Sequence, residues 1–174
     1  MASRSSSGPG LDADERRCAE DVERYGLHLI HVAPNGDLPG WSYSIGLPDT
    51  LQHPELIVFG LPRDTAHAML NTAADEIRAG RPFSDGAETD ALLDGYSCLA
   101  RTVMPIWYEP LVGWARWYHR SDGFQLLQLL WPDRQHRYPW DPDVIAEVRQ
   151  RQPRLFEPDP DVSGMRPTSD SLGR

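Results

Sequence analysis

The sequence lacks lysine entirely, has only two cysteines and has no long hydrophobic run. Its 17 basic residues are all arginine and are outnumbered by 26 acidic residues, which gives a formal net charge of −9. This acidic excess argues against nucleic acid as a partner, because binding to phosphates needs a basic surface. The longest apolar run, residues 124–131, is far shorter than the roughly 20 residues that span a bilayer, so we expect no membrane association.

The sequence patterns of metal and cofactor sites are also missing. No H-x-x-x-H, H-E-x-x-H or Cys-x-x-Cys spacing occurs, and no G-x-G-x-x-G loop joins a strand to a helix. We therefore expect no metal ion and no cofactor. No catalytic residue can be assigned from the sequence, so whether the chain is an enzyme stays open.

The N-terminal segment and the two cysteines point to a cytoplasmic protein. Residues 1–10 are rich in serine and glycine and lack the apolar centre of a signal peptide. Cys18 and Cys98 lie far apart, and a domain of this size with a proper core needs no disulfide. We expect both thiols to be free and buried.

Composition and periodicity predict one α+β domain over residues 12–156, flanked by disordered tails at 1–11 and 157–174. Turn, capping and alternation signals predict strands and helices in the order α-β-β-β-α-β-α-β-α. Strands joined by a hairpin come first and helices intervene later. This order favours a mixed or mostly antiparallel sheet of about five strands with helices packed on it. The expected strands are 27–33, 40–47, 55–61, 95–104 and 124–131, and the expected helices are 12–25, 64–79, 107–120 and 142–151.

A strip of small residues on the strand 40–47 is the first candidate site. Alternation places Ser42, Ser44 and Gly46 on the face opposite Trp41 and Tyr43. Such a strip allows a helix or a ligand to approach the backbone closely. Close helix packing is favoured over ligand binding, and both stay open. A nucleophilic serine is the least favoured interpretation, because Ser44 stands where the G-x-S-x-G elbow has its second glycine and no helix follows at once.

Polar residues in and after the strand 124–131 form the second candidate. Gln128 lies on an apolar strand face, so either the backbone or a ligand must satisfy its amide. Asp133 follows the strand and can cap a turn or serve as a functional carboxylate. Trp131 and Trp140 can pack on the domain or form the wall of a pocket.

Two acid/base pairs can be drawn from the histidines. His53 can pair with Ser42 or Ser44, and Asp133 with His136. Together these patterns predict a cleft in which at least three of five side chains share one pocket, because buried polar groups need partners. The five are Ser44, His53, Gln128, Asp133 and Trp140.

Four motifs in order resemble a bacterial family of uncharacterised function, domain of unknown function four-two-six-two. They are residues 40–47 (Gly-x-Ser-Tyr-Ser-Ile-Gly-Leu), 53–61 (His-Pro-Glu-Leu-Ile then Gly-Leu), 127–133 (Leu-Gln-x-x-Trp-Pro-Asp) and 139–141 (Pro-Trp-Asp). The resemblance covers about 18–141 and implies a soluble bacterial protein, with no activity and no catalytic residues to carry over. Members usually have glycine in the turn after Trp-Pro-Asp, where this chain has Gln135-His136-Arg137.

Two functions are consistent with these patterns. The first is small-molecule binding or sensing, or an undescribed enzymatic reaction, in one cleft lined by Ser42, Ser44, His53, Gln128, Trp131, Asp133 and Trp140. An anionic ligand would suit residues 95–156, which carry 8 arginines and only 6 acidic residues. The alternative is an acidic protein-interaction module of the toxin-neutralising (immunity) type, which would bind a basic protein partner.

Overall fold

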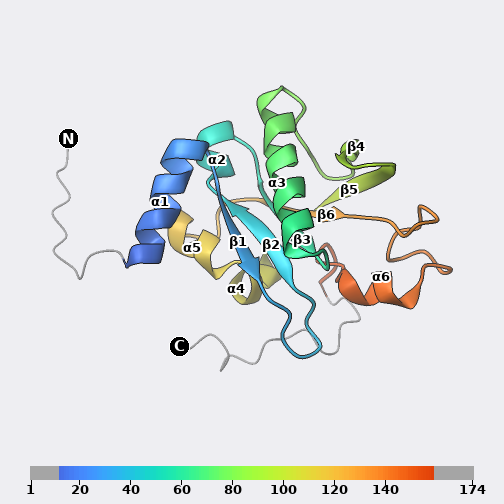
Figure 1. The fold of residues 1–174 in the computed structure, drawn as a ribbon. Helices are drawn as coiled ribbons and strands as arrows, with labels where there is room; N and C mark the ends of the chain where they lie inside the picture. The colour runs from blue at the N-terminus through green and yellow to red at the C-terminus, as the bar shows by residue number, and fades with distance from the viewer. Residues whose placement is uncertain (1–11, 159–174) are drawn as a thin grey trace, which may run out of the picture.

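The computed structural model describes residues 12–158 (Figure 1). The predicted tail 1–11 and residues 159–174 of the predicted tail 157–174 lie outside the described residues. Six strands form one sheet in the order β1-β2-β3-β6-β5-β4. Neighbouring strands are antiparallel, except that β3 and β6 are parallel. The strands are β1 (His28–Val32), β2 (Trp41–Ile45), β3 (Glu55–Phe59), β4 (Glu88–Leu93), β5 (Tyr96–Thr102) and β6 (Leu126–Leu130).

The sequence-based prediction of an α+β fold with a mixed sheet is confirmed. The strand beyond the five expected is β4, in which Leu92 is the one buried residue, so it lacks the apolar pattern of a core strand. Within the described residues, no helix combines the length and the apolar character needed to cross a membrane.

The helices are α1 (Ala13–Tyr25), α2 (Leu47–Leu51), α3 (Arg63–Arg78), the 3₁₀ turn η1 (Pro105–Trp107), α4 (Tyr108–Leu111), α5 (Gly113–His119) and α6 (Ala146–Arg151).

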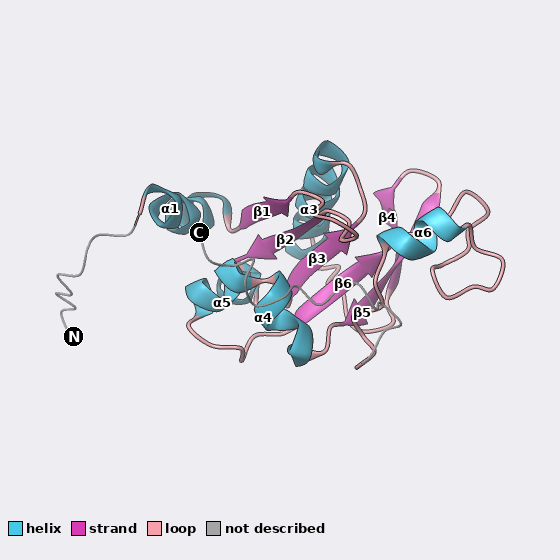
Figure 2. Ribbon diagram, turned by 90° about the horizontal axis from the view of Figure 1, so that it is seen from below, coloured by secondary structure: helices cyan, strands magenta, loops and turns pink. Residues whose placement is uncertain are grey.

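The helices cover both faces of the sheet and create two hydrophobic cores. On one face α3 packs over Leu56, Val58 and Leu129. On the other face α1, α4 and α5 pack over Tyr43 and Ile57. Figure 2 shows α3 on one side of the strands and α4 and α5 on the opposite side. This division decides which side chains can meet, because alternate residues of each strand enter different cores.

Local signals explain how α1 begins, ends and packs. Asp12 and Glu15 form a capping box, in which the Asp12 carboxylate accepts hydrogen bonds from backbone N–H groups of the first turn. Gly26 ends the helix in the left-handed conformation at φ 85°. At Gly46, an added Cβ would lie 2.6 Å from Val22 of α1, so this glycine allows α1 to approach the chain closely just after β2.

Several helical segments differ from the expected elements. α2 was not expected, and α6 begins at Ala146 rather than at residue 142. The predicted helix 107–120 is divided into η1, α4 and α5, because Val112 leaves the helical region with φ −129°. The indole N–H of Trp107 donates to the carbonyl oxygen of Glu157 at 3.2 Å, so the first residue of the expected C-terminal tail contacts the folded body. The domain boundary at residue 156 stays a prediction.

Candidate functional site

A cleft of about 710 Å³ opens beside the β1–β2 hairpin. One wall is the hairpin with its turn, the second is the loop 60–63 between β3 and α3, and the third is formed by Glu147, Gln150 and Arg151 of α6. Small-molecule sites commonly have volumes of about 300 to 1,000 Å³. The size of this cleft therefore suits a small molecule.

Glycine allows two of these walls to approach each other. At Gly60, whose φ is +75°, an added Cβ would lie 2.6 Å from the Cβ and 2.7 Å from the carbonyl oxygen of Arg151. The Gly60 N–H also donates to the carbonyl oxygen of Gly40 at 2.9 Å. Because any side chain at position 60 would push α6 away, this glycine sets the position of the third wall.

A hydroxyl–imidazole pair lies in the cleft. Ser42 and His31 are cross-strand partners of β2 and β1, and both line the cleft. The Oγ of Ser42 is 2.7 Å from Nδ1 of His31. The other ring nitrogen of His31, Nε2, is 3.3 Å from Nδ1 of His67 on α3. A continuous hydrogen-bonded row of serine, histidine and histidine therefore reaches from the cleft to the exposed surface of α3.

The electrostatics of this row are set by burial and by Arg63. Burial of His31 is the largest cause that lowers its pKa below the ordinary 6.5, and the guanidinium of Arg63 and the ring of His67 lower it further. A lowered pKa keeps the imidazole of His31 neutral near pH 7, with one ring nitrogen free to accept a proton.

Of the seven site residues expected from the sequence, Ser42 lines the cleft and the other six do not. Ser42 also pairs with His31 rather than with His53. The side chains of Ser44, His53, Gln128, Trp131, Asp133 and Trp140 each have partners elsewhere in the fold. The expected convergence on one pocket is not observed, and a ligand-binding role for these six residues stays a prediction.

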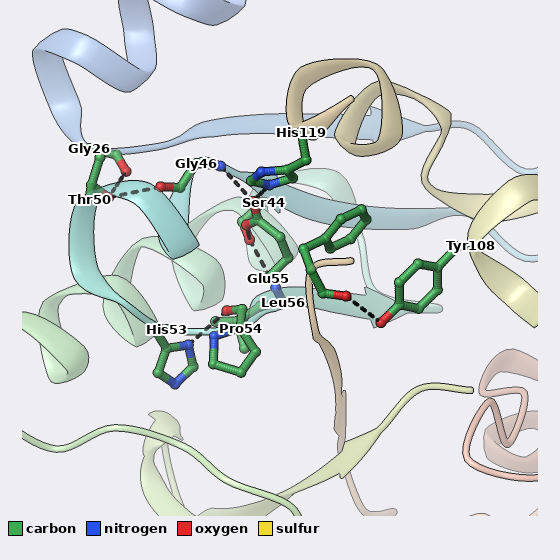
Figure 3. Close-up of polar contacts among 11 residues, drawn as sticks. Gly26, Ser44, Gly46, Thr50, His53, Pro54, Glu55, Leu56, Tyr108 and His119 are labelled. Atoms are coloured by element: carbon green, nitrogen blue, oxygen red, sulfur yellow. Dashed lines mark hydrogen bonds and ion pairs between the residues drawn. The ribbon is translucent and has the colours of Figure 1, made fainter. Parts of the chain in front are cut away.

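Ser44 belongs to a buried network centred on Glu55, which is fully buried in β3. The Glu55 carboxylate accepts hydrogen bonds from Ser44 Oγ at 2.6 Å and from Gly46 N at 2.6 Å. The imidazole Nε2 of His119, on α5, lies 2.8 Å from the same carboxylate. Figure 3 shows Glu55 between the end of β2 and His119. This network joins the sheet to the helices of one face, and none of its side-chain hydrogen bonds within residues 12–158 reaches a residue that lines the cleft.

His53 has a separate structural role. Its Nδ1 lies 2.7 Å from the carbonyl oxygen of Pro54 (Figure 3), and its Nε2 accepts a hydrogen bond from the backbone N–H of Phe83 at 2.9 Å. The ring thus joins β3 to the segment that precedes β4, and both of its nitrogens are occupied.

Gln128 and Trp131 form hydrogen bonds with different segments of the chain. The amide of Gln128 donates to the carbonyl oxygen of Pro153 at 2.6 Å and accepts from the N–H of Leu155 at 3.1 Å. The indole N–H of Trp131 donates to the carbonyl oxygen of Phe59 at 2.8 Å. Trp131 belongs to the core under α3 and Leu155 to the other core. Their positions on different faces explain why these two motif residues cannot share one pocket.

Asp133 and Trp140 stabilise the loop after β6. One carboxylate oxygen of Asp133 accepts from the backbone N–H groups of Gln135 and Arg137, and the other accepts from the Arg137 guanidinium. Asp133 is therefore a turn cap, one of the two roles expected. In the same turn His136 has φ 62°, a conformation that glycine adopts without strain. This is the turn in which the resemblance leads one to expect glycine. Trp140 stacks on Tyr138 at 5.1 Å.

Among the residues of the cleft that the sequence patterns did not single out are His31 and Arg63. His31 was one of several histidines without a metal motif, and Arg63 precedes the expected start of its helix. His67, which joins the row from α3, was also unassigned. Within residues 12–158 no three His, Cys, Asp or Glu side chains are arranged to hold a metal ion.

Comparison with known proteins identifies the family. Neither the curated proteins nor the solved structures include a match to this chain. The family model described as Domain of unknown function (DUF4262) matches residues 21–145. That range covers all six strands, helices α2 to α5 and the end of α1, so the match extends over most of the fold. The chain therefore belongs to the DUF4262 family.

Proposed function

We propose that this protein binds a small anionic molecule in the cleft beside the β1–β2 hairpin. The observation that supports this most directly is Arg63. It lines the cleft, and its guanidinium is close enough to His31 to lower the pKa of that ring. No acidic partner for it is found among the ion pairs of residues 12–158. The other arginine of the cleft, Arg151, is already paired with Glu147.

The surrounding groups suit a ligand that has an anionic end and a polar body. An arginine binds carboxylate or phosphate oxygens through two parallel hydrogen bonds. The imidazole of His31 and the hydroxyl of Ser42 offer further polar contacts on rigid strands. Carboxylates and phosphates share this chemistry, and the binding assay distinguishes them.

The test is isothermal titration of the full chain with small carboxylates and small phosphates, together with thermal shift. A ligand at 100 times its Kd adds about 2.7 kcal/mol to the free energy of unfolding, so binding also raises Tm. Arg63→Gln should abolish binding of the compound that titrates best. Arg17→Gln removes an exposed arginine from α1 and serves as the matched control. Equal binding by wild type and Arg63→Gln would refute the proposal.

The cellular setting is a further part of the proposal. Cys18 and Cys98 are free and buried, and burial raises the pKa of the Cys18 thiol to about 11. Free thiols suit a reducing compartment, which supports the expected cytoplasmic location in a bacterium. The acidic protein-interaction module stays the alternative prediction. Its binding would depend on surface acids and weaken with salt rather than depend on Arg63.

A further inference from the structure

We infer that Ser42 is the nucleophile of an acyl-transfer site in the cleft, with His31 as its general base and His67 as the residue that positions His31. This inference rests on the proposed function, because the substrate class we assign is a small ester with an anionic group. Arg63 would hold the anionic group while the ester carbonyl meets Ser42. The geometry of the Ser42–His31–His67 row carries the inference.

The first step of the argument is distance. Ser42 Oγ and His31 Nδ1 are 2.7 Å apart, within the reach of about 2.6–3.2 Å that a nucleophile and its general base require. For Nδ1 to accept the serine proton, the ring must carry its own hydrogen on Nε2. His67 Nδ1 lies 3.3 Å from that Nε2 and can accept this hydrogen. The second histidine thus favours the tautomer in which His31 is a base towards Ser42.

The second step is the position of the row. Ser42 and His31 lie directly opposite each other on paired antiparallel strands, so the sheet holds their separation. Both line the cleft. Ser44 has the same side chain two residues along β2, but its hydroxyl donates to the buried Glu55 carboxylate. Ser42 is thus the serine of this strand that has both a neutral base and access to the cleft.

The chemistry balances without any group beyond the substrate and water. Ser42 Oγ attacks the ester carbonyl carbon as its proton passes to His31 Nδ1. The bond from that carbon to the alkoxy oxygen breaks, and His31 returns the proton to the departing alcohol. Water then attacks the acyl-serine as its proton passes to His31. The bond from the acyl carbon to Ser42 Oγ breaks, His31 returns that proton to Ser42 Oγ, and the carboxylic acid is released.

The experiment uses the full chain with two probes. Phenylmethanesulfonyl fluoride reports a reactive serine by a covalent mass increase, which peptide mapping locates. The monoester of p-nitrophenol with glutaric acid, compared with p-nitrophenyl acetate, reports turnover and the preference for an anionic substrate. We expect labelling at Ser42 and faster hydrolysis of the anionic ester.

The variants separate the three roles. Ser42→Ala should abolish labelling, and His31→Gln should lower kcat by about 100-fold or more, the range of general-base catalysis. His67→Phe should lower kcat with KM unchanged, and His67→Gln, which can still accept a hydrogen bond, should restore part of it; a merely structural His67 would leave kcat unchanged. Ser121→Ala, at an exposed turn, is the control and should behave as wild type.

The outcomes distinguish this inference from the proposed function. Suppose that the wild type binds small anions, but the sulfonyl fluoride does not label Ser42 and the wild type hydrolyses the esters no faster than Ser42→Ala does. The nucleophile is then refuted and the binding function stands. Labelling confined to another residue also refutes it. If Ser42 is labelled while no anion binds and Arg63→Gln hydrolyses both esters as wild type does, the anionic ligand fails and the nucleophile stands.

Discussion

Removing the Glu55 carboxylate should destabilise the protein strongly. Glu55 is fully buried and serves three donors, namely Ser44 Oγ, Gly46 N and His119 Nε2 at 2.6, 2.6 and 2.8 Å. Glu55→Ala leaves all three without this acceptor. Leaving a buried donor unsatisfied costs about 1–3 kcal/mol, and three donors lose their acceptor here. We therefore expect a loss of at least about 3 kcal/mol.

Glu55→Gln provides an intermediate case. The amide oxygen can still accept from Gly46 and His119, but the amide NH₂ faces the hydroxyl of Ser44. That hydroxyl already accepts the backbone N–H of Leu56 at 2.9 Å. To accept from the new amide NH₂, the Ser44 hydroxyl would have to turn its own hydrogen away from the position 55 side chain, to which it now donates. We expect this variant to lose about 1.5–3 kcal/mol, the value of one hydrogen bond to a charged group.

Urea unfolding followed by tryptophan fluorescence measures these losses, with Glu20→Gln on the exposed face of α1 as the control. The control should stay within about 0.5 kcal/mol of wild type. In a domain of this size, 3 kcal/mol corresponds to a fall in Tm of about 6–12 °C. A Glu55→Ala protein within 1 kcal/mol of wild type, at about unchanged m-value, would show that the network contributes little and refute the reasoning.

Three further predictions follow from single contacts. Gln128→Leu should lower the free energy of unfolding by about 2–4 kcal/mol in urea, because two buried backbone groups lose the partners that its amide supplies; a neutral variant would contradict the structural role. Gly46→Ala should destabilise by at least about 1–3 kcal/mol, since φ is +106° and the new Cβ would meet Val22 at 2.6 Å, and Gly80→Ala, which has a similar φ but open space, should lose less in the same titration. Burial lowers the pKa of His53 below 6.5. The contribution of His53 to the free energy of unfolding is therefore fully present above pH 6.5 and is lost as the pH falls through the folded-state pKa, where protonation removes the acceptor for Phe83. Between pH 7 and 5 the free energy of unfolding should thus decrease more steeply with falling pH for wild type than for His53→Gln, and equal pH dependence of the two proteins would argue against this role.

The alternation of the strands could be predicted, but the register of the hairpin could not. A turn centred on residues 34–37 would place Gly40 opposite His31. In the structure Asn35 bridges Leu38, so Gly36 and Asp37 occupy the centre of the turn and Ser42 lies opposite His31. In the observed turn Gly36 supplies a positive φ of 57° and Asn35 does not, so the Asn-Gly preference for positive φ at both central positions does not select this register. A shift of this kind keeps every side chain on its predicted face, which is why the strand assignments are correct and the serine–histidine pair was missed.

Burial of polar residues was also only partly predictable. The Asp12 capping box was visible because its partners are three residues apart. Glu55 was assigned to a central strand, but its partner His119 is 64 residues away, and nothing local indicates that α5 would cover it. The same holds for Gln128, whose backbone partners come from the segment after α6. Sequence patterns show that such residues need partners, and only the tertiary structure shows which ones they have.

The residues of the cleft and those of the buried networks are connected through β2. Trp41 donates from its indole N–H to the carbonyl oxygen of Leu111 at 2.9 Å, and Ser44 is held by Glu55. Ser42 lies between these two anchors on the same strand, so its backbone is held on both sides. Chemistry that depends on a serine and a histidine at hydrogen-bond distance requires placement to within about 0.5 Å. The buried network around Glu55 thus supplies rigidity to the strand from which Ser42 meets His31, and weakening it should loosen the cleft before the fold is lost.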